Sequence, residues 1–528
     1  MSTNSLPHSS PQTTKQNIAK SGLRVALDPI SSVIVMENHD QAYHVWHKAE
    51  VKDRVLIHID AHHDMWWIPE KGKLHVANFV CLALRENLLS EVYWVVPDRA
   101  LETARNRKAI LGHLRKLDQA YPGPHASPKV GSEQLVAELL GKRLTICSLN
   151  SLPQIEATVL LDIDIDFFVI PRVFYGEHDR QEAIPWCWPE DLLERLSACN
   201  IRTDMVTIAY SVEGGYTPLK WKYLGEELKL RLRQPREGDP AVRAFELMRV
   251  AAERRRHGDP SEVEKQYRQV TELLPSASAP YYHLAEYYLD TGRATEAQTL
   301  FQRLLSLDPS YRTPYNSKGI EYLEEGRLNQ AEEVHRRTLI LDPGDPYAFL
   351  GLGQIEIRRK HWKEAELLLR NSLMLADTLP DTYRYLGEVL SQQRRTTEAI
   401  AAYTRSLKLV LSGHKCLARP IATEKGHSLQ DPNHLRVHFE LARLYDSQGD
   451  ISQAIQGYRL SLGGGYESFT GRIRLAQLYL GQLKWQQAAS EVWRAMPLAL
   501  SSLSSPVRNG FRRVRRAILK VAAASDRP

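Results

Sequence analysis

Residues 58–65 read HIDAHHDM and place Asp60, His62 and Asp64 at alternate positions directly after the apolar run 55–57. Ionised carboxylates are costly to bury at the end of an apolar segment unless a positive group meets them. Because alternate residues of a strand share one face, we expect these three side chains to point the same way. Two carboxylates and an imidazole suit a divalent metal ion, so the spacing predicts a metal site.

A second acidic segment lies in VLLDIDIDFFVI, residues 159–170, where Asp162, Asp164 and Asp166 alternate with apolar residues. Three like charges on one face repel one another strongly in apolar surroundings. Two cations would offset this repulsion, whereas a solvated edge strand would not explain the Phe-Phe-Val-Ile run that follows. Together the two segments predict a centre that holds two divalent metal ions.

The elements that must position these residues belong to an α/β domain over residues 23–230. Short β-branched runs alternate there with helical or polar stretches, which is typical of a mostly parallel sheet with buried strands. Ligands of such sheets bind beyond the carboxyl ends of the strands, where both acidic segments fall. The runs are SSVIVM, RVLIHID, EVYWVV, RLTICSL, ATVLLDIDIDFFVI and MVTIAYS.

From residue 245 to residue 500 the sequence is helical and repetitive. Alanine recurs every 34 residues at positions 297, 331, 365 and 399, and proline does so at 275, 309 and 343. This period predicts about seven tetratricopeptide repeats, with an insertion near 411–432 and a linker at 231–244. Such repeats form a solenoid whose concave face binds extended peptides or proteins. The alternatives are that the repeats brace the N-terminal half or join copies into a homo-oligomer.

Composition excludes several classes of protein. A chain of 528 residues is too long for one core, and 43% apolar and 25% charged residues are ordinary for a globular protein. Five cysteines without a CxxC spacing fit a reducing cytoplasm. The charge of +6 suits an acidic peptide as well as nucleic acid. Residues 1–22 read as a disordered tail, residues 501–528 as a basic helix or tail, and no apolar run reaches membrane-spanning length.

The motifs resemble a known enzyme superfamily. Asp-Ala-His-x-Asp followed by a later Asp-x-Asp strand is similar to the ureohydrolases, the arginases and agmatinases. Further matches occur in the family's order: His39 in VMENHD, His75 in KLHVANF and Glu213 in YSVEGGYT. The matches cover about residues 35–217, and their order is more specific than any single motif.

The resemblance implies a three-layer α/β arginase-like fold with two divalent ions, most often manganese. One ion would be held by His39, Asp60, Asp64 and one aspartate of the second acidic segment. The other ion would be held by Asp60, His62 and two aspartates of that segment. The family has Asp-x-Asp-x-x-Asp-Pro where this chain has Asp-x-Asp-x-Asp, so either Asp162 and Asp164 or Asp164 and Asp166 are the direct ligands.

The resemblance also implies a reaction. Hydroxide generated at the metal ions attacks a guanidinium carbon, Glu213 binds the guanidinium and His75 carries a proton to the leaving amine. Urea is released, and arginine becomes ornithine.

One departure changes the expected substrate. Met65, Trp66 and Trp67 follow the motif where enzymes for free arginine carry polar residues. Indoles cannot neutralise a carboxylate, but Trp66 and Trp67 can line a cleft for a longer substrate or pack in the core. The ENHD, HIDAH and LDIDIDFF pattern resembles a branch that includes the peptide arginases of ribosomal-peptide maturation. We therefore expect a peptide substrate whose leader the repeats hold.

Three alternatives remain at this point. A deacetylase-like amide hydrolase would use one zinc ion, which the number of predicted ligands disfavours. A repeat scaffold with a vestigial metal domain would be expected to lack ligands, and none is missing. Nucleic-acid binding rests only on the basic run FRRVRRAILK at 511–520, which reads as a solvated helix.

Overall fold

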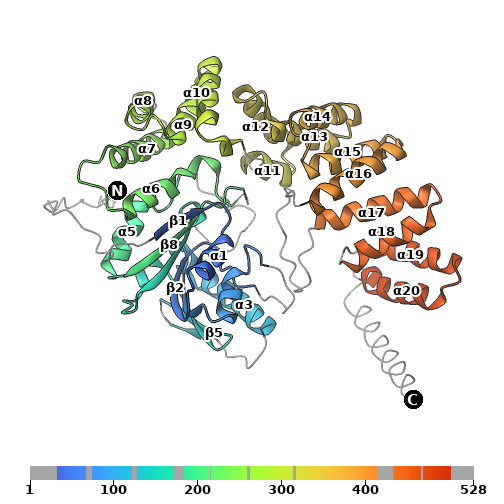
Figure 1. Ribbon diagram of the computed structural model, residues 1–528, viewed down its shortest axis with the longest axis horizontal. Helices are drawn as coiled ribbons and strands as arrows, with labels where there is room; N and C mark the ends of the chain where they lie inside the picture. Colours follow the sequence, from blue (N-terminus) through green and yellow to red (C-terminus); the bar gives the residue numbers. More distant parts are fainter. Residues whose placement is uncertain are drawn as a thin grey trace, which may run out of the picture.

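A computed structural model describes residues 32–66, 74–121, 128–131, 133–170, 184–213, 216–257, 262–312, 317–412, 432–464, 466 and 468–500. These residues form an N-terminal region built on a sheet and a C-terminal array of helices that curves past it (Figure 1). The predicted tails at 1–22 and 501–528 lie outside the described residues. No helix in the described part of the chain is long and apolar enough to span a membrane.

The strands of the described residues form one sheet in the order β1-β8-β7-β2-β3-β6-β5-β4. The first six strands in this order are parallel, whereas β5 and β4 are antiparallel to their neighbours. The mostly parallel sheet predicted from the sequence is therefore confirmed. The bounds are β1 Ser32–Met36, β2 Arg54–Ile59, β3 Leu89–Val95, β4 Lys129–Val130, β5 Leu135–Leu139, β6 Lys142–Cys147, β7 Val159–Asp164 and β8 Thr203–Ala209.

Helices cover both faces of the sheet. Neighbouring residues of a strand point to opposite faces, so Leu56 and Ile57 of β2 enter different apolar cores. The Leu56 core includes residues of α1 (Gln41–Lys48), α2 (Phe79–Arg85) and α3 (Ala104–Ala120). The Ile57 core includes residues of α4 (Asp166–Val169), α5 (Pro189–Ala198) and α6 (Tyr223–Leu232). The N-terminal region thus has three layers.

The helical array consists of consecutive pairs of helices. The alanines at 297, 331, 365 and 399 are all fully buried, as expected for positions where the two helices of a pair approach closely. In the described residues, α16 ends at Leu411 and α17 begins at Pro432, which brackets the predicted insertion. The bounds are α7 Pro240–His257, α8 Val263–Leu273, α9 Ser278–Asp290, α10 Ala294–Leu307, α11 Ser317–Glu324, α12 Leu328–Leu341, α13 Pro346–Arg359, α14 Trp362–Leu375, α15 Pro380–Gln392, α16 Thr396–Leu411, α17 Pro432–Ser447, α18 Ile451–Gly463, α19 Phe469–Gly481 and α20 Trp485–Leu500.

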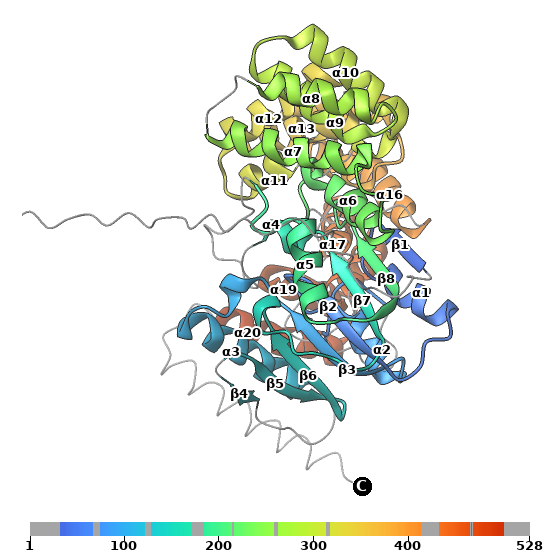
Figure 2. The ribbon, with the colours of Figure 1, turned by 90° about the vertical axis from the view of Figure 1, so that its left-hand side faces the viewer.

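The two regions share a core. Helix α7 begins at Pro240, inside the range 231–244 that the sequence predicts as a linker, because proline is well suited to the first turn of a helix. Phe245 and Met248 of α7 lie in the same apolar cluster as Leu161 of β7 and Leu224 of α6. Figure 2 shows α6 between the sheet and α7. The first repeats therefore pack directly on the sheet region.

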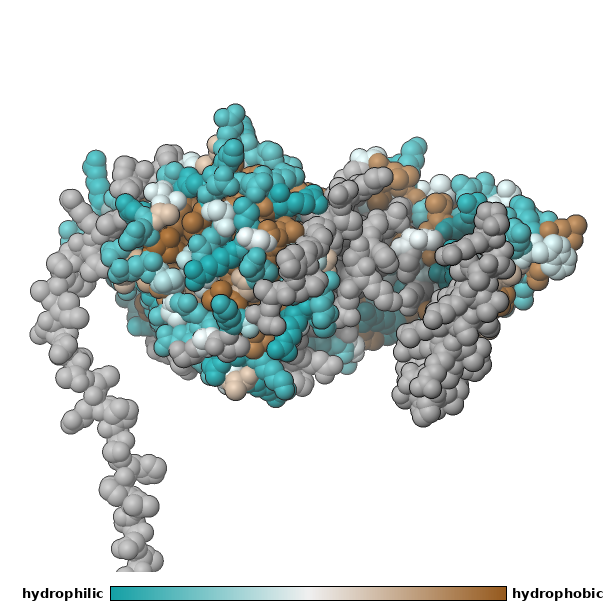
Figure 3. Space-filling view, turned by 90° about the horizontal axis from the view of Figure 1, so that it is seen from below, coloured by the Kyte–Doolittle hydropathy of each residue, from teal (hydrophilic) through white to brown (hydrophobic). Residues whose placement is uncertain are grey.

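The face of the molecule seen in Figure 3 is mixed in character. Figure 3 shows mostly hydrophilic side chains with apolar ones scattered between them. Some large apolar side chains on the outer repeat helices are strongly exposed, such as Met374 at 85% and Leu411 at 79%.

Candidate metal centre

Four neighbouring strands bring the predicted ligands to one edge of the sheet. Strands β1, β8, β7 and β2 are adjacent and parallel, so their carboxyl ends lie side by side. His39 follows β1, the segment 60–64 follows β2, and Ser211 follows β8. Asp162 and Asp164 lie near the end of β7, and Asp166 begins α4.

His39 is the centre of a first group of ligands. Its Nδ1 atom lies 3.1 Å from Asp60 Oδ2, 3.3 Å from Asp64 Oδ2 and 3.1 Å from Asp164 Oδ2. All four residues are buried. A nitrogen lone pair and three carboxylate oxygens that converge on one point provide a suitable set of donors for a divalent cation.

His62 belongs to a second group that shares a residue with the first. Its Nδ1 atom lies 2.8 Å from Asp166 Oδ2 and 3.4 Å from Asp60 Oδ1. Asp60 therefore presents one carboxylate oxygen to each group and could serve both. The His62 side chain is 25% exposed, whereas that of Asp60 is 1% exposed, so the second group lies nearer to solvent.

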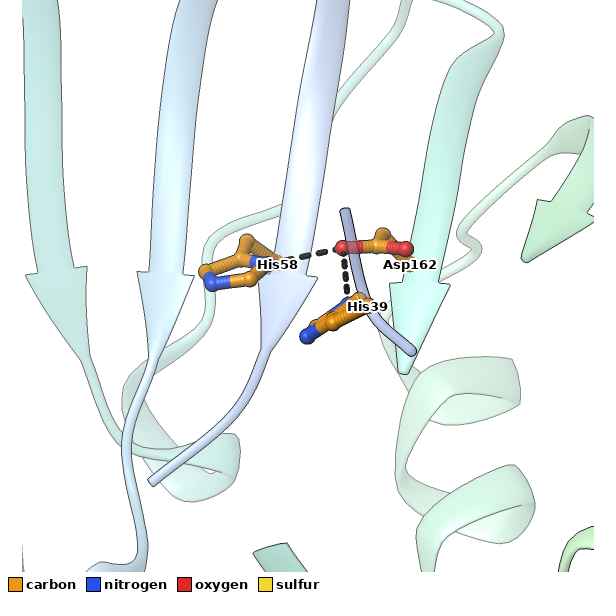
Figure 4. A group of neighbouring side chains, drawn as sticks. All are labelled: His39, His58 and Asp162. Carbon is orange, nitrogen blue, oxygen red and sulfur yellow. Dashed lines mark hydrogen bonds and ion pairs between the residues drawn. The ribbon is translucent and has the colours of Figure 1, made fainter. Parts of the chain in front are cut away.

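Asp162 lies behind the first group and does not face Asp60. Its Oδ2 atom accepts hydrogen bonds of 2.8 Å from both His39 Nε2 and His58 Nδ1, as Figure 4 shows. Its Oδ1 atom accepts a hydrogen bond of 2.5 Å from Thr207 Oγ1. Because His39 Nε2 donates to Asp162, Nδ1 is the ring atom that faces the three carboxylates. The geometry thus points to Asp164 and Asp166 as ligands and to Asp162 as the residue that orients His39.

Several carboxylates crowd together in this group, and their charges shift one another's pKa values. Burial and the charge of Asp60 raise the pKa of Asp64 to about 6. Burial and the charges of Asp164 and Asp60 raise the pKa of Asp166 well above its usual range. Burial opposes a charge on His39, but the surrounding carboxylates prevail and raise its pKa well above the ordinary value. A proton or a metal ion between His39 Nδ1 and these oxygens would offset their repulsion.

Unsatisfied polar atoms support two divalent ions at this place. Four buried atoms in the cluster have no hydrogen-bond partner among the described residues: His39 Nδ1, His58 Nε2, Asp60 Oδ2 and Asp166 Oδ2. Buried polar atoms without partners are rare in native proteins and need an explanation. Three of the four face the two groups of ligands, and the fourth, His58 Nε2, lies 3.4 Å from Asp60 Oδ2, so the residues present fit a pair of metal ions.

Two residues of the site have an unusual backbone. Asp64 and Ser211 adopt φ values of 52° and 51°, a region that costs a residue other than glycine about 1 kcal/mol. This conformation turns Asp64 toward His39, and Ser211 Oγ donates a hydrogen bond of 2.6 Å to Asp164 Oδ2. Strand β2 ends at Ile59, so the expectation that Asp60, His62 and Asp64 share the face of a strand is wrong. They gather because the chain turns, not because it is extended.

His75 is near the centre but outside the two groups. Its Nδ1 atom accepts a hydrogen bond of 3.2 Å from the Ala77 amide, which leaves the proton of the neutral ring on Nε2. Burial lowers its pKa, and the charge of Asp40, the residue after His39, acts in the opposite direction. The position of His75 beside the His39 loop is compatible with a proton carrier at the edge of the site.

The tryptophans contribute less to the site than the sequence allows. The Trp66 ring packs against the rings of His63 and His113, with centroids 5.2 and 5.0 Å away. Trp66 is partly buried against the core that contains Leu56, which favours the packing role over the role of a cleft wall. Trp67 lies outside the described residues.

Glu213 is exposed on the turn that follows β8. Its backbone N–H donates a hydrogen bond of 2.6 Å to Glu37 Oε1, and burial raises the pKa of Glu37. Sequence reasoning missed Glu37, Thr207 and Ser211. Glu37 has a detectable signal, because it is a carboxylate placed directly after the apolar strand run in VMENHD, whereas an isolated serine or threonine has none.

Comparisons with known proteins concern the repeats. Residues 279–311 and residues 316–373 match the tetratricopeptide repeat family. A comparison with curated proteins gives no match.

Several solved structures are similar to parts of the chain. The crystal structure of MamA is 18% identical, with a TM-score of 0.27, over 34% of this chain and 92% of that chain. PilF of Pseudomonas aeruginosa is 20% identical, with a TM-score of 0.29, over 45% of this chain and 96% of that chain. YrrB, described as a tetratricopeptide protein with an unusual peptide-binding site, is 16% identical, with a TM-score of 0.25, over 39% and 95%. Nothing about function follows from likeness at this level. What is established is that residues 279–373 of this chain are tetratricopeptide repeats, joined to a mostly parallel α/β sheet region.

Proposed function

We propose that the N-terminal region is an arginase-like hydrolase with two metal ions that acts on arginine side chains of a peptide. The reaction consumes water, releases urea and leaves ornithine in the peptide. The observation that carries the proposal is the position of Asp60, which presents one oxygen to His39 and the other to His62. The three-layer order of helices and sheet is compatible with an arginase-like fold, which is part of the proposal.

The ligands divide between two sites. His39, Asp60, Asp64 and Asp164 would hold one ion, and Asp60, His62 and Asp166 would hold the other. When bound, a pair of divalent ions, which we propose to be Mn²⁺, supplies a hydroxide at neutral pH. An amide hydrolase with one metal ion would need only the first group, so the second group favours the arginase-like reaction.

Other residues bind the substrate and move protons. Glu213 would accept charge-assisted hydrogen bonds from the guanidinium and so fix its carbon at the metal edge of the sheet. His75 would donate a proton from Nε2 to the leaving amine, because its Nδ1 atom is already engaged by a backbone N–H. The amine that leaves the guanidinium carbon is then the side-chain nitrogen of ornithine.

The repeats would hold the peptide. Tetratricopeptide arrays present concave surfaces that bind extended segments of peptides or proteins. Both His62 and Glu213 are accessible from solvent, so an arginine on a long substrate could reach the metal edge. We propose that the protein acts in the cytoplasm during the maturation of a ribosomally made precursor peptide.

One experiment tests this proposal. The full chain is stripped with a chelator, reloaded with Mn²⁺ and incubated with peptides that contain arginine and, separately, with free arginine. We expect arginine peptides to lose about 42 daltons per converted residue (CH₂N₂), because hydroxide attack removes urea. Asp60→Asn should abolish the loss. Asp204→Asn is the matched control, because Asp204 lies at the opposite end of β8 and pairs with Arg54.

The result that contradicts the proposal is equally concrete. If the protein binds two Mn²⁺ ions but changes the mass of no peptide, the scaffold function becomes the better account. If it removes acyl groups from lysine peptides with one ion bound, it is an amide hydrolase.

A further inference from the structure

The segment from Tyr210 to Glu213 connects the metal centre to the repeats. Tyr210 directly follows β8, and its ring is 5.3 Å from the ammonium of Lys222. The same ammonium is 5.3 Å from the ring of Tyr311 and 3.0 Å from Asp308 Oδ2, both at the end of the repeat that begins with α9. The Lys222 side chain is 12% exposed, so this contact between the two regions is largely shielded from water.

The next two residues, Ser211 and Val212, contact different regions of the protein. Ser211 Oγ donates a hydrogen bond to Asp164 Oδ2 in the metal centre. Val212 is 2% exposed and belongs to an apolar cluster whose other members are almost all residues of the repeats. These members include Ala251, Leu284, Tyr288, Phe301, Tyr311 and Leu341. Two consecutive residues, Ser211 and Val212, thus contact the metal centre and the core of the repeats respectively.

The backbone around Glu213 is fixed by hydrogen bonds. The Ser211 N–H donates to the Glu37 carbonyl at 2.9 Å, and the Glu213 N–H donates to the Glu37 side chain. The Ser211 carbonyl accepts hydrogen bonds of 3.1 Å from the amides of Tyr216 and Thr217. This turn places the Glu213 side chain on the exposed side, while Val212 anchors it in the repeats.

A charge interaction also links Glu213 to a residue of the repeats. Tyr347 is in the first turn of α13, and its pKa is raised by burial and by the charges of Asp345 and Glu213. The carboxylate of Glu213 therefore interacts electrostatically with a residue of the repeats.

We infer that the repeats position Glu213, with Val212 and Lys222 as the positioning residues, and form one wall of the substrate site. This inference rests on the proposed function for the role of Glu213, but the coupling between the repeats and the turn can be tested alone. It implies that an arginine within an extended peptide, approaching from the α13 side, is the substrate that fits.

The test compares Val212→Ala with Val389→Ala. Val389 lies in α15, is fully buried in a separate repeat core and loses the same two methyl groups. In the full chain, we expect Val212→Ala to speed hydrogen exchange at the amides of Ser211, Glu213, Tyr216 and Thr217 by about tenfold or more, and Val389→Ala to leave these amides unchanged. Val212→Ile, which keeps a β-branched apolar side chain at this position, should exchange these amides as slowly as the wild type does.

Two further measurements separate positioning from general loss of stability. In Val212→Ala, the KM for an arginine peptide should rise about tenfold with a smaller change in kcat, since Glu213 binds the guanidinium. The affinity for Mn²⁺ should change less than the KM, because Val212 is not itself a proposed metal ligand. If the amides of this turn exchange at the same rate in Val212→Ala and in Val389→Ala, the inference is wrong. A wild-type protein that releases no urea overturns the proposed function instead, because the exchange result does not depend on activity.

Discussion

Replacing Asp162 by asparagine should weaken metal binding without removing a ligand. Asp162 Oδ2 accepts hydrogen bonds of 2.8 Å from His39 and from His58, and Oδ1 accepts one from Thr207. Asparagine has nearly the same shape and keeps an oxygen for the two imidazoles, and its NH₂ group can donate to the Thr207 hydroxyl. The substitution thus removes the negative charge and little else.

The magnitude follows from the strength of these hydrogen bonds. A bond to a charged group contributes about 1.5–3 kcal/mol and a neutral one about 1 kcal/mol. Only the bond to His39 lies behind a proposed ligand, so we expect a loss of about 1–2 kcal/mol, or about 5- to 30-fold in affinity. This estimate overlaps the range of about 10- to 100-fold found when residues that support metal ligands are changed.

The assay is a titration of chelator-stripped protein with Mn²⁺, in which free Mn²⁺ is measured by electron paramagnetic resonance. Asp162→Asn should bind two ions with reduced affinity, Asp164→Asn should bind one ion or none, and Asp204→Asn should match the wild type. If Asp162→Asn loses an ion entirely, Asp162 is a direct ligand and the assignment of roles is wrong. If its affinity is unchanged, the carboxylate does not act through His39.

Three other outcomes are expected. His335 is buried, and its pKa is lowered to about 4, whereas in the unfolded chain it is protonated below about pH 6.5. The free energy of unfolding of the wild type should therefore fall by about 2 kcal/mol between pH 7 and pH 5. In His335→Leu, the urea midpoints at pH 7 and pH 5 should lack this loss. Gly351→Ala should destabilise the repeats by about 1–3 kcal/mol in urea, because its Cβ would lie 2.3 Å from the His335 ring, and His335→Ala should suppress much of that cost. Mn²⁺ at about 100 times its Kd should stabilise the chain by about 2.7 kcal/mol per site, seen as a higher Tm that a chelator reverses and that Asp60→Asn abolishes.

The repeats and most of the sheet could be predicted because their signals are periodic. The alanines 34 residues apart identify the places where helices cross, and each of them is buried as expected. The six parallel strands coincide with apolar β-branched runs. Strands β4 and β5 escape prediction, because a short antiparallel edge lacks the continuous apolar run of a buried strand.

The sequence indicated which residue types would gather at the end of the sheet, but it did not assign them roles. The order of the motifs along the chain indicated His39, Asp60, His62 and Asp64 as candidate ligands. It could not rank Asp162, Asp164 and Asp166, because that depends on β7 ending at Asp164 and on α4 starting at Asp166. Strand alternation gave the wrong reason for the clustering after β2, since the left-handed backbone of Asp64 is a property of the folded turn.

The apolar cluster that runs from β7 through α6 into α7 and α9 has a practical consequence for engineering. Cutting the chain between residues 232 and 240 would leave both fragments with an uncovered apolar face, and we expect neither to stay soluble alone. If the repeats hold a peptide as proposed, changing its identity would call for swapping distal repeats beyond α13 and keeping the proximal ones with the sheet on which they pack.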